Sequence, residues 1–505
     1  MAKIDEKVLW KAAEKLRDKC DPADYKNVVL GLVFLKYVSD RYLAKYDELK
    51  KVGDGRENDN DYYIADHVFL VPEKARWPYI ASFSKDESLG QKIDEAFELL
   101  EKQNIELKGI LPKTYSKSDL DKIALGELVD FFTTTLKMDN ADGDFFGQIY
   151  EYYIGAFATY IPQKGGEFFT PQSIVEMMVE ILQPYKGRVF DPCCGSGGMF
   201  VQCSKFVKEH RGKVDDISIY GQESNPGTWK MAKMNLAIRG LSGDLGEANG
   251  DSFTNDLHKS LRADFILANP PYNVADYWKP SLEGDPRWIF GKPNTKNANY
   301  AWLELMYAKL APRGKAAILM PNGATTSNNT DDKKVRKAML EAGKVDAIVD
   351  LPDKLFSNTG ISVQCWVLDR AKTDTDVLFI NATKLGRMKT RKIRVLKGSE
   401  DDDKFDSKTE QNEIDLIANT YHKYKNDDNY EDKLGFCKKA TLEEIKEKDY
   451  SLNPGRYVGV DDSNKLSPEE LNEQLKKTTQ ELLQLMEESK DLEAKVIEIL
   501  KNEIK

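Results

Sequence analysis

Short apolar runs alternate with amphipathic segments through the middle of the chain, from about residue 165 to residue 380. Runs typical of strands lie at 188–190, 217–221, 265–268, 316–320, 345–351, 361–368 and 377–380. Strands that alternate with helices over such a length predict a Rossmann-like, doubly wound and largely parallel α/β sheet. Ligands bind such sheets at the carboxyl ends of the strands, so the residues that follow each run are the first candidates for a site.

The regions on either side of this alternation have a different character. Residues 1–160 carry apolar side chains at helical spacing, such as Val28, Leu32 and Leu35, and predict a helical N-terminal domain. Residues 161–396 form the expected sheet domain. Residues 397–465 are charged and weakly periodic, with an acidic run at 400–403, and predict a solvated linker.

The last segment, residues 466–505, predicts one long helix with a narrow apolar stripe. Ser467-Pro468-Glu469-Glu470 matches a helix start with a cap, a first-turn proline and a capping-box glutamate. The seam positions that follow alternate steps of four and three over about four heptads; they are Leu471, Leu475, Thr478, Leu482, Leu485, Ser489, Leu492, Val496 and Ile499. A stripe this narrow favours packing against the helices of a partner, and packing back onto the chain's own domain is the alternative.

Composition excludes several classes of protein. No window approaches about 18 uninterrupted apolar residues, and the N-terminus lacks the apolar segment of a signal peptide, so we expect a cytoplasmic protein without a membrane span. Six scattered cysteines and four histidines predict neither a metal site nor a disulfide framework. The formal net charge is -10, whereas a protein that binds DNA alone usually has a basic face. A DNA substrate would therefore require a partner.

The run from Asp191 to Gly198 follows a strand and opens a helix. Glycines let the main chain approach a ligand, and a helix N-terminus favours an anionic group. Phe200 stands where the third glycine of the dinucleotide fingerprint would be, so a dinucleotide is not expected. The candidate cofactor-binding residues in this run are Asp191, Gly195, Ser196, Gly197 and Gly198.

Two more acidic residues are expected at strand ends. Glu223 is placed to accept both hydroxyls of a ribose, and Asp251, expected at the end of the third strand, is placed to accept from an adenine amino group. Three acids, a glycine turn and no phosphate-binding lysine describe an adenosine ligand without phosphates, which fits S-adenosylmethionine. The competing interpretation is that each acid caps a turn, and that Cys193-Cys194 is small-residue packing inside one.

Asn269-Pro270-Pro271-Tyr272 directly follows the apolar run at 265–268. The motif places an amide, a carbonyl restricted by prolines and an aromatic ring at a strand's carboxyl end. The Asn269 side-chain oxygen and the Pro270 main-chain oxygen can each accept a hydrogen from one exocyclic amino group, while Tyr272 stacks on the ring that carries it. Neither acceptor titrates, so the predicted catalysis acts through orientation and electrostatics.

In this order, five segments resemble the motifs of amino-group DNA adenine methyltransferases: Gly166-Glu-Phe-Phe-Thr-Pro171, Asp191-Pro-Cys-Cys-Gly-Ser-Gly-Gly198, Gly221-Gln-Glu223, Gly250-Asp-Ser-Phe253 and Asn269-Pro-Pro-Tyr272. More closely, the chain resembles the modification subunit of type I restriction-modification systems. Residues 9–17 and 25–40 resemble the helical N-terminal domain of that family. Asn-Pro-Pro-Tyr is also shared with protein-glutamine and RNA methyltransferases, which are the alternative. The Phe-Phe-Thr-Pro motif and the N-terminal domain favour the DNA enzyme.

The resemblance implies that residues 161–396 transfer a methyl group from S-adenosylmethionine to N6 of a flipped adenine in double-stranded DNA. Asn269 and Pro270 would hold N6, and Phe356 or Trp366 would close the other face of the base. The implied partners are a specificity subunit on the C-terminal helix, a restriction subunit and a second copy of the modification subunit. The positions that the resemblance adds at the methionine end of the cofactor are Glu167, Phe168, Phe169, Thr170, Pro171 and Gln172.

The 273–299 segment, directly after Tyr272, has two open interpretations. It contains Tyr277-Trp278-Lys279 and the run from Trp288 to Lys292, and a long loop beside a catalytic motif is often functional. In one interpretation these basic and aromatic residues contact DNA. In the other, the segment is a lid on the cofactor or is ordered by its own aromatic side chains.

Overall fold

The computed structural model describes residues 6–17, 22–117, 119–136, 145–160, 169–357, 359–426 and 428–460, with scattered positions between 475 and 492. The chain divides into a large unit, Met1–Val458, and a second unit, Gly459–Lys505. Among the described residues, no helix has the length and apolar content needed to span a membrane.

The first part of the large unit is helical, as the apolar spacing predicts. Val28, Leu32 and Leu35 are all buried, and α2 begins at Pro22, whose fixed φ and missing N–H suit a first helical turn. The helices described in this part are α1 (Glu6–Glu14), α2 (Pro22–Val52), α3 (Asp61–Ile64), α4 (Trp77–Ala81), α5 (Leu89–Gln103), α6 (Lys122–Thr135) and α7 (Phe145–Tyr160).

Strands and helices then alternate as expected. Asn225 caps α10 by accepting from the N–H groups of Gly227 and Thr228, and Gly197 opens α9 with a φ of 82°. The elements are α8 (Gln172–Leu182), β1 (Gly187–Asp191), α9 (Gly198–Glu209), β2 (Ile217–Gly221), α10 (Pro226–Ile238), β3 (Gly243–Asp244), β4 (Ala263–Ala268), α11 (Asn299–Lys309), β5 (Leu310–Pro321), α12 (Thr330–Glu341), β6 (Val345–Asp350), β7 (Val363–Asp369), β8 (Val377–Asn381), β9 (Arg387–Met388), β10 (Arg394–Val395), α13 (Glu413–Asn426), β11 (Cys437–Ala440) and α14 (Leu442–Glu447).

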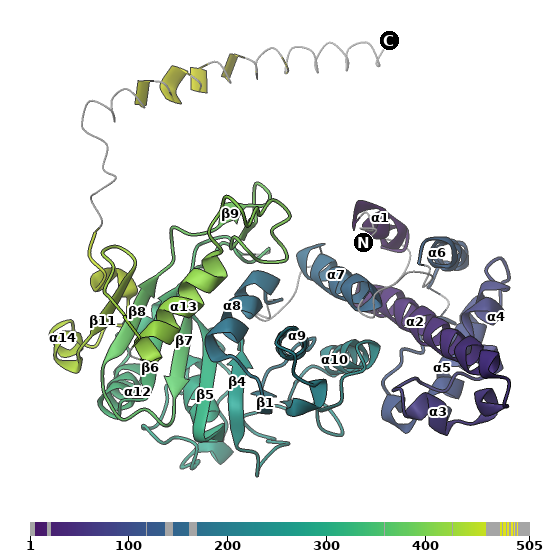
Figure 1. Ribbon diagram of the computed structural model, residues 1–505, viewed down its shortest axis with the longest axis horizontal. Helices are drawn as coiled ribbons and strands as arrows, with labels where there is room; N and C mark the ends of the chain where they lie inside the picture. The colour runs from purple at the N-terminus through teal and green to yellow at the C-terminus, as the bar shows by residue number, and fades with distance from the viewer. Residues whose placement is uncertain are drawn as a thin grey trace. The chain divides into compact units, whose positions relative to one another are not determined.

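Within the described residues, nine strands form one sheet in the order β11-β8-β6-β7-β5-β4-β1-β2-β3 (Figure 1). The neighbours from β3 through β5 are parallel, and so are β6 and β8. β7 lies antiparallel between β5 and β6, and β11 adds an antiparallel edge next to β8. The largely parallel sheet is therefore confirmed. Its strand order reverses between β1 and β4, where open sheets bind ligands.

Alternate residues of the central strands face two separate cores. Leu267 and Leu319 belong to a core shared with α8, α9 and α10. Ile266 and Ile318 point into a core built with α11 and α12. All residues of β6 are buried, as expected for a strand covered by helices on both faces of its sheet.

The N-terminal helices share the first of these cores, through Leu32 of α2 and Tyr153 of α7 among others. The two regions are also joined by polar contacts. Arg239, at the end of α10, donates to the main-chain oxygen of Gly147 and to the carboxylate of Glu151 on α7, both at 2.8 Å. α7 is thereby fixed beside α10, near the carboxyl end of the sheet.

The expectation of a linker at 397–465 is wrong for most of that range. α13 packs against α8 and β8, and β11 pairs with β8 (Figure 1). Ile417 and Tyr421 of α13 are fully buried. In the acidic run, Asp402 is buried and pairs with Arg387, with 2.9 Å between Oδ2 and Nε. The folded unit continues to Val458.

The predicted heptad helix, residues 466–505, falls in the second unit. Its described positions between 475 and 492 are helical and exposed. The described seam positions are Leu475, Thr478, Leu482, Ser489 and Leu492. The seam positions that lie outside the described residues are Leu471, Leu485, Val496 and Ile499.

Candidate active site

A cavity of about 870 Å³ lies at the carboxyl ends of β1, β2 and β4. Most of the predicted site residues meet in it. Pro171, Gly197, Pro270 and Tyr272 are described but are not in its lining, and Glu167 and Phe168 lie outside the described residues. The predicted residues that line it are Phe169, Thr170, Gln172, Asp191, Gly195, Ser196, Gly198, Glu223, Asp251, Asn269 and Pro271.

The turn between β1 and α9 presents its main chain to this cavity. Gly195 has a φ of 54°, a left-handed conformation that favours glycine. A Cβ atom on Gly195 or Gly198 would meet no atom within 4 Å, so both glycines border open space. A Cβ on Gly197 would instead lie 3.9 Å from Ala232 and from Leu236, so this glycine serves the packing of α9 on α10.

Two acidic side chains, Asp191 and Glu223, accept hydrogen bonds from main-chain N–H groups of this turn. Asp191 is buried and accepts from the N–H of Cys193 at 2.9 Å, and burial raises the pKa of its carboxyl to about 7. Glu223 follows β2 and accepts from the N–H of Gly195 at 3.0 Å and from that of Asn225 at 2.7 Å. Both carboxylates therefore cap turns, and both also line the cavity.

Asp251 is not at the end of the third strand, because β3 ends at Asp244. It lies in a later loop, where its carboxylate accepts from the N–H of Phe253 at 2.8 Å. The main chain of this loop returns to β2 through Gly250, whose N–H donates to the Glu223 carbonyl at 2.8 Å. Asp251 lines the cavity together with Glu223 by this route, although the strand that was expected to end at it is absent.

The two cysteines of the turn both line the cavity. Cys194 is buried, and burial raises the pKa of both the Cys193 and the Cys194 thiol well above its usual value. Both thiols stay protonated at neutral pH, which makes them poor nucleophiles. Among the described residues, no group of three or more His, Cys, Asp or Glu side chains could hold a metal ion.

The Asn269 side chain is fixed by hydrogen bonds on both sides. Its Nδ2 donates to Oγ1 of Thr170 at 2.9 Å, and its Oδ1 accepts from the Tyr272 hydroxyl. The amide oxygen keeps a second lone pair for another donor. Tyr272 itself is buried, with 8% of its surface exposed, so its ring belongs to the core rather than to the cavity lining.

Neither aromatic candidate for the far face of a target base reaches this cavity. Trp366 is fully buried in the core beneath α11, where its ring meets Tyr300 at 6.1 Å between centroids. Phe356 is buried in the other core. The aromatic side chains that the described part of the chain does bring to the lining are Phe157, Phe169, Phe253, Tyr277 and Trp302.

The 273–299 segment is held partly by contacts within it, as the second interpretation expects, and these contacts do not test whether it meets DNA. Trp278 stacks on Trp288 with 6.1 Å between ring centroids. The main-chain N–H of Asn273 donates to Oδ1 of Asn299 at 2.9 Å, which ties the start of the segment to its end. Tyr277 and Asp276 line the cavity, so part of the segment forms a wall.

One wall of the cavity was not predicted from the sequence. The N-terminal helices form it. Leu30 of α2 and Glu151, Ile154, Phe157 and Ala158 of α7 line the cavity. The α7 positions recur at helical spacing, a pattern that identifies one face of a helix. That pattern does not identify the surface that the face covers, because the contact joins residues far apart in the chain.

Family models match almost the whole chain. The model of the N-6 DNA Methylase family matches residues 141–465, and that of the HsdM N-terminal domain matches residues 6–132. The type I restriction enzyme HindI methylase subunit of Haemophilus influenzae is 41% identical over 411 residues, covering 77% of this chain and 90% of that protein. The MjaIX methylase subunit of Methanocaldococcus jannaschii is 34% identical and covers 98% of this chain and 90% of that protein.

Solved structures agree with these matches. The methyltransferase subunit of a type I restriction-modification system from Streptococcus thermophilus is 26% identical, with a TM-score of 0.76 over 90% of this chain and 98% of that chain. A modification subunit from Vibrio vulnificus, 18% identical with a TM-score of 0.60, has the same fold over 87% of this chain and 93% of that chain. Fold, site and sequence agree that the chain belongs to the N-6 DNA methylase family, among the methylase subunits of type I restriction enzymes.

Proposed function

We propose that this chain transfers a methyl group from S-adenosylmethionine to N6 of adenine in double-stranded DNA, with Asn269 at the reaction centre. The observation that carries the proposal is the position of Asn269. Its amide lines the same cavity as the glycine turn, and Thr170 and Tyr272 fix its orientation.

The residues of the cavity fit this cofactor. S-adenosylmethionine supplies an electrophilic sulfonium methyl group and carries a ribose and an adenine but no phosphate. The lining contains Asp191, Glu223 and Asp251, which suit a ligand with a positive centre and two hydroxyls. Gly195 and Gly198 border open space for its main body. We assign Glu223 to the ribose, Asp251 to the adenine and the residues from 167 to 172 to the methionine end.

The chain's own residues act on the target amine by holding it. The N6 lone pair is delocalised into the purine ring, which makes the amine a weak nucleophile. Oδ1 of Asn269 and the main-chain oxygen of Pro270 accept its two hydrogens and favour a tetrahedral nitrogen. Tyr272 acts through Asn269, because its hydroxyl occupies one lone pair of Oδ1 and so directs the other.

A partner selects the DNA site. The chain is acidic, with a net charge of -10, and therefore suits a partner that supplies affinity for DNA. We propose that the exposed seam of the C-terminal helix packs on a helical specificity subunit, within a complex that also holds a second copy of this chain and a restriction subunit. Leu475, Leu482 and Leu492 are 65%, 57% and 62% exposed, as expected of a surface that a partner covers.

Substitutions on the full chain test this contact. Replacing Leu475, Leu482 and Leu492 with Asp should abolish co-purification with the specificity subunit, because three charges would be buried in the seam. The matched control replaces Lys476 and Gln480, which are exposed on the opposite side of the same helix, with Asp. Retained assembly of the triple variant would rule out the helix as the contact.

The activity is tested by tritiated methyl transfer with and without the co-expressed specificity subunit. We expect N6-methyladenine in duplex DNA, and only when the partner is present. Incorporation into RNA or protein alone, under the same conditions, would contradict the proposal.

A further inference from the structure

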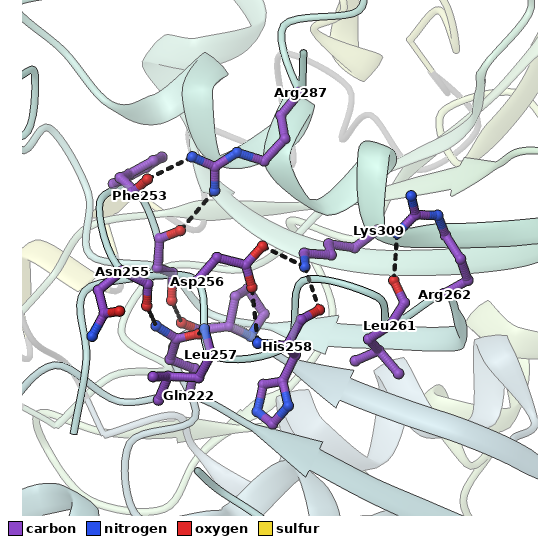
Figure 2. Close-up of polar contacts among 12 residues, drawn as sticks. Gln222, Phe253, Asn255, Asp256, Leu257, His258, Leu261, Arg262, Arg287 and Lys309 are labelled. Carbon is purple, nitrogen blue, oxygen red and sulfur yellow. Dashed lines mark hydrogen bonds and ion pairs between the residues drawn. The ribbon is translucent and has the colours of Figure 1, made fainter. Parts of the chain in front are cut away.

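Arg287 ties the 273–299 segment to the loop that carries Asp251, residues 250–258, here called the Asp251 loop. Its Nη1 donates to the main-chain oxygen of Ser252 at 2.8 Å, and its Nη2 donates to that of Phe253 at 2.5 Å (Figure 2). Asp285 holds the same guanidinium through Nε at 2.9 Å and Nη2 at 2.7 Å. The planar fork of an arginine can make all of these bonds at once.

The Asp251 loop has no regular secondary structure. Side chains from three other parts of the chain hold it (Figure 2). Gln222, after β2, donates to the main-chain oxygen of Asn255 at 2.7 Å. Lys309, on α11, donates to the carboxylate of Asp256 at 2.6 Å. These two contacts fix the later part of the loop to the sheet domain. Arg287 fixes its beginning, next to Asp251, to the segment that follows the catalytic motif.

The two segments form one wall of the cavity. The ring of Phe253 meets that of Tyr277 at 4.9 Å and that of Trp302 at 4.3 Å between centroids. All three rings line the cavity, and so does Asp251. The guanidinium of Arg287 therefore holds the main chain of Ser252 and Phe253, the two residues that follow Asp251 in the cavity lining.

We propose that Arg287 is a positioning residue for the adenine end of the cofactor site, and that cofactor binding and the order of the 273–299 segment are coupled through it. This rests on the proposed function, since it takes the ligand at Asp251 to be S-adenosylmethionine. Loss of the guanidinium frees two carbonyls and the start of the Asp251 loop. The bound cofactor must then order that loop by itself, and the order is no longer passed on to the 273–299 segment.

The test is direct titration of purified full-length protein with S-adenosylmethionine by calorimetry. Arg287→Ala should raise the dissociation constant by about tenfold or more, because two charge-assisted hydrogen bonds are lost. Arg287→Lys should give an intermediate value, since one ammonium can keep one carbonyl but not the whole fork. In methyl-transfer assays, KM for the cofactor should rise while kcat at saturation stays within about threefold.

The matched control is Arg262→Ala. Arg262 is an exposed arginine that donates to the carbonyl of Leu261, just beyond the Asp251 loop (Figure 2). We expect no change in cofactor affinity. A second readout is hydrogen exchange, in which the cofactor should slow exchange across residues 276–290 of the wild type but not of Arg287→Ala.

Cofactor affinity of Arg287→Ala within about twofold of the wild type would overturn the inference and leave the proposed function standing. Equal protection of residues 276–290 in both proteins would overturn it as well. A wild type that binds no S-adenosylmethionine would instead refute the proposed function itself.

Discussion

Two segments that wall the cavity at strand ends are built in opposite ways. The main chain of the turn after Asp191 is held by side chains that reach it from other parts of the chain, namely Glu223, Asn235 and Ser252. The 273–299 segment is held from a distance, with Arg287 bonded to Ser252 across 35 positions of sequence. The turn is thus held by side chains from around it, whereas the longer segment extends one of its own side chains, Arg287, to a neighbouring loop.

This difference separates two kinds of contribution to the site. The turn borders open space and carries little of the target chemistry, so its variants should act on cofactor binding. The 273–299 segment connects the cofactor wall to Asn269. Variants of the residues that hold this segment should therefore change the stability of the protein and the coupling between the cofactor site and Asn269. Variants at Glu223, Glu304 and Tyr272 test this division in order of decreasing expected effect.

Glu223→Gln should have the largest effect. The carboxylate accepts from the N–H groups of Gly195 and Asn225, and an amide can accept with only one of its two ends. We expect S-adenosylmethionine affinity to fall by about 10- to 100-fold, which corresponds to about 1.4–2.8 kcal/mol. Calorimetric titration measures this, and an unchanged affinity would show that the turn is not the cofactor's support.

Glu304→Gln should have a pH-dependent effect on the stability of the longer segment. Glu304 is fully buried on α11 and accepts from the N–H of Phe290 at 2.8 Å, and its other oxygen has no hydrogen-bond partner among the described residues. Burial raises the pKa of its carboxyl to about 8. The folded protein therefore holds this proton more tightly than the unfolded chain, so wild-type stability is lost as pH rises from about 4.5 to about 8.

The amide of the Glu304→Gln variant keeps an acceptor for Phe290 and does not ionise. Its melting temperature relative to wild type should therefore rise between pH 5 and pH 8.5, equivalent to up to about 4 kcal/mol. Thermal denaturation at both pH values gives the comparison. A difference that is constant with pH would mean that Glu304 does not titrate in this range.

Tyr272→Phe should have the smallest effect. It removes the hydroxyl that donates to Oδ1 of Asn269 and leaves the buried ring in place. We expect kcat to fall by about three- to tenfold with cofactor affinity unchanged. A fall of several hundredfold would instead place the hydroxyl in direct contact with the substrate.

The parts of the site that could be predicted are those whose signal is local. Eight consecutive residues from Asp191 to Gly198 specify a turn, and Asn269 is identified by the apolar run before it. Asp251 was found through its motif although the expected strand was not there. The α7 wall and the role of Arg287 were not predictable, because each depends on a surface that only the folded chain brings close.

The folded region at 397–458 shows a different limit. β11 is an edge strand, and Lys438 and Lys439 give it the charge that protects exposed edges from pairing. Because of the same charge, the sequence predicts a solvated linker at this strand. A signal for α13 was present, since Ile414, Ile417 and Tyr421 recur at helical spacing, but the acidic run upstream outweighed it.

The most direct test of the central claim measures Asn269→Ala and wild type in the same preparation, assembled with the specificity subunit. Calorimetry gives S-adenosylmethionine affinity, and tritium incorporation into duplex DNA gives the rate. We predict that transfer is abolished while the dissociation constant for the cofactor changes by less than about threefold. Retained transfer, or loss of cofactor binding, would contradict the assignment of Asn269 to the target amine.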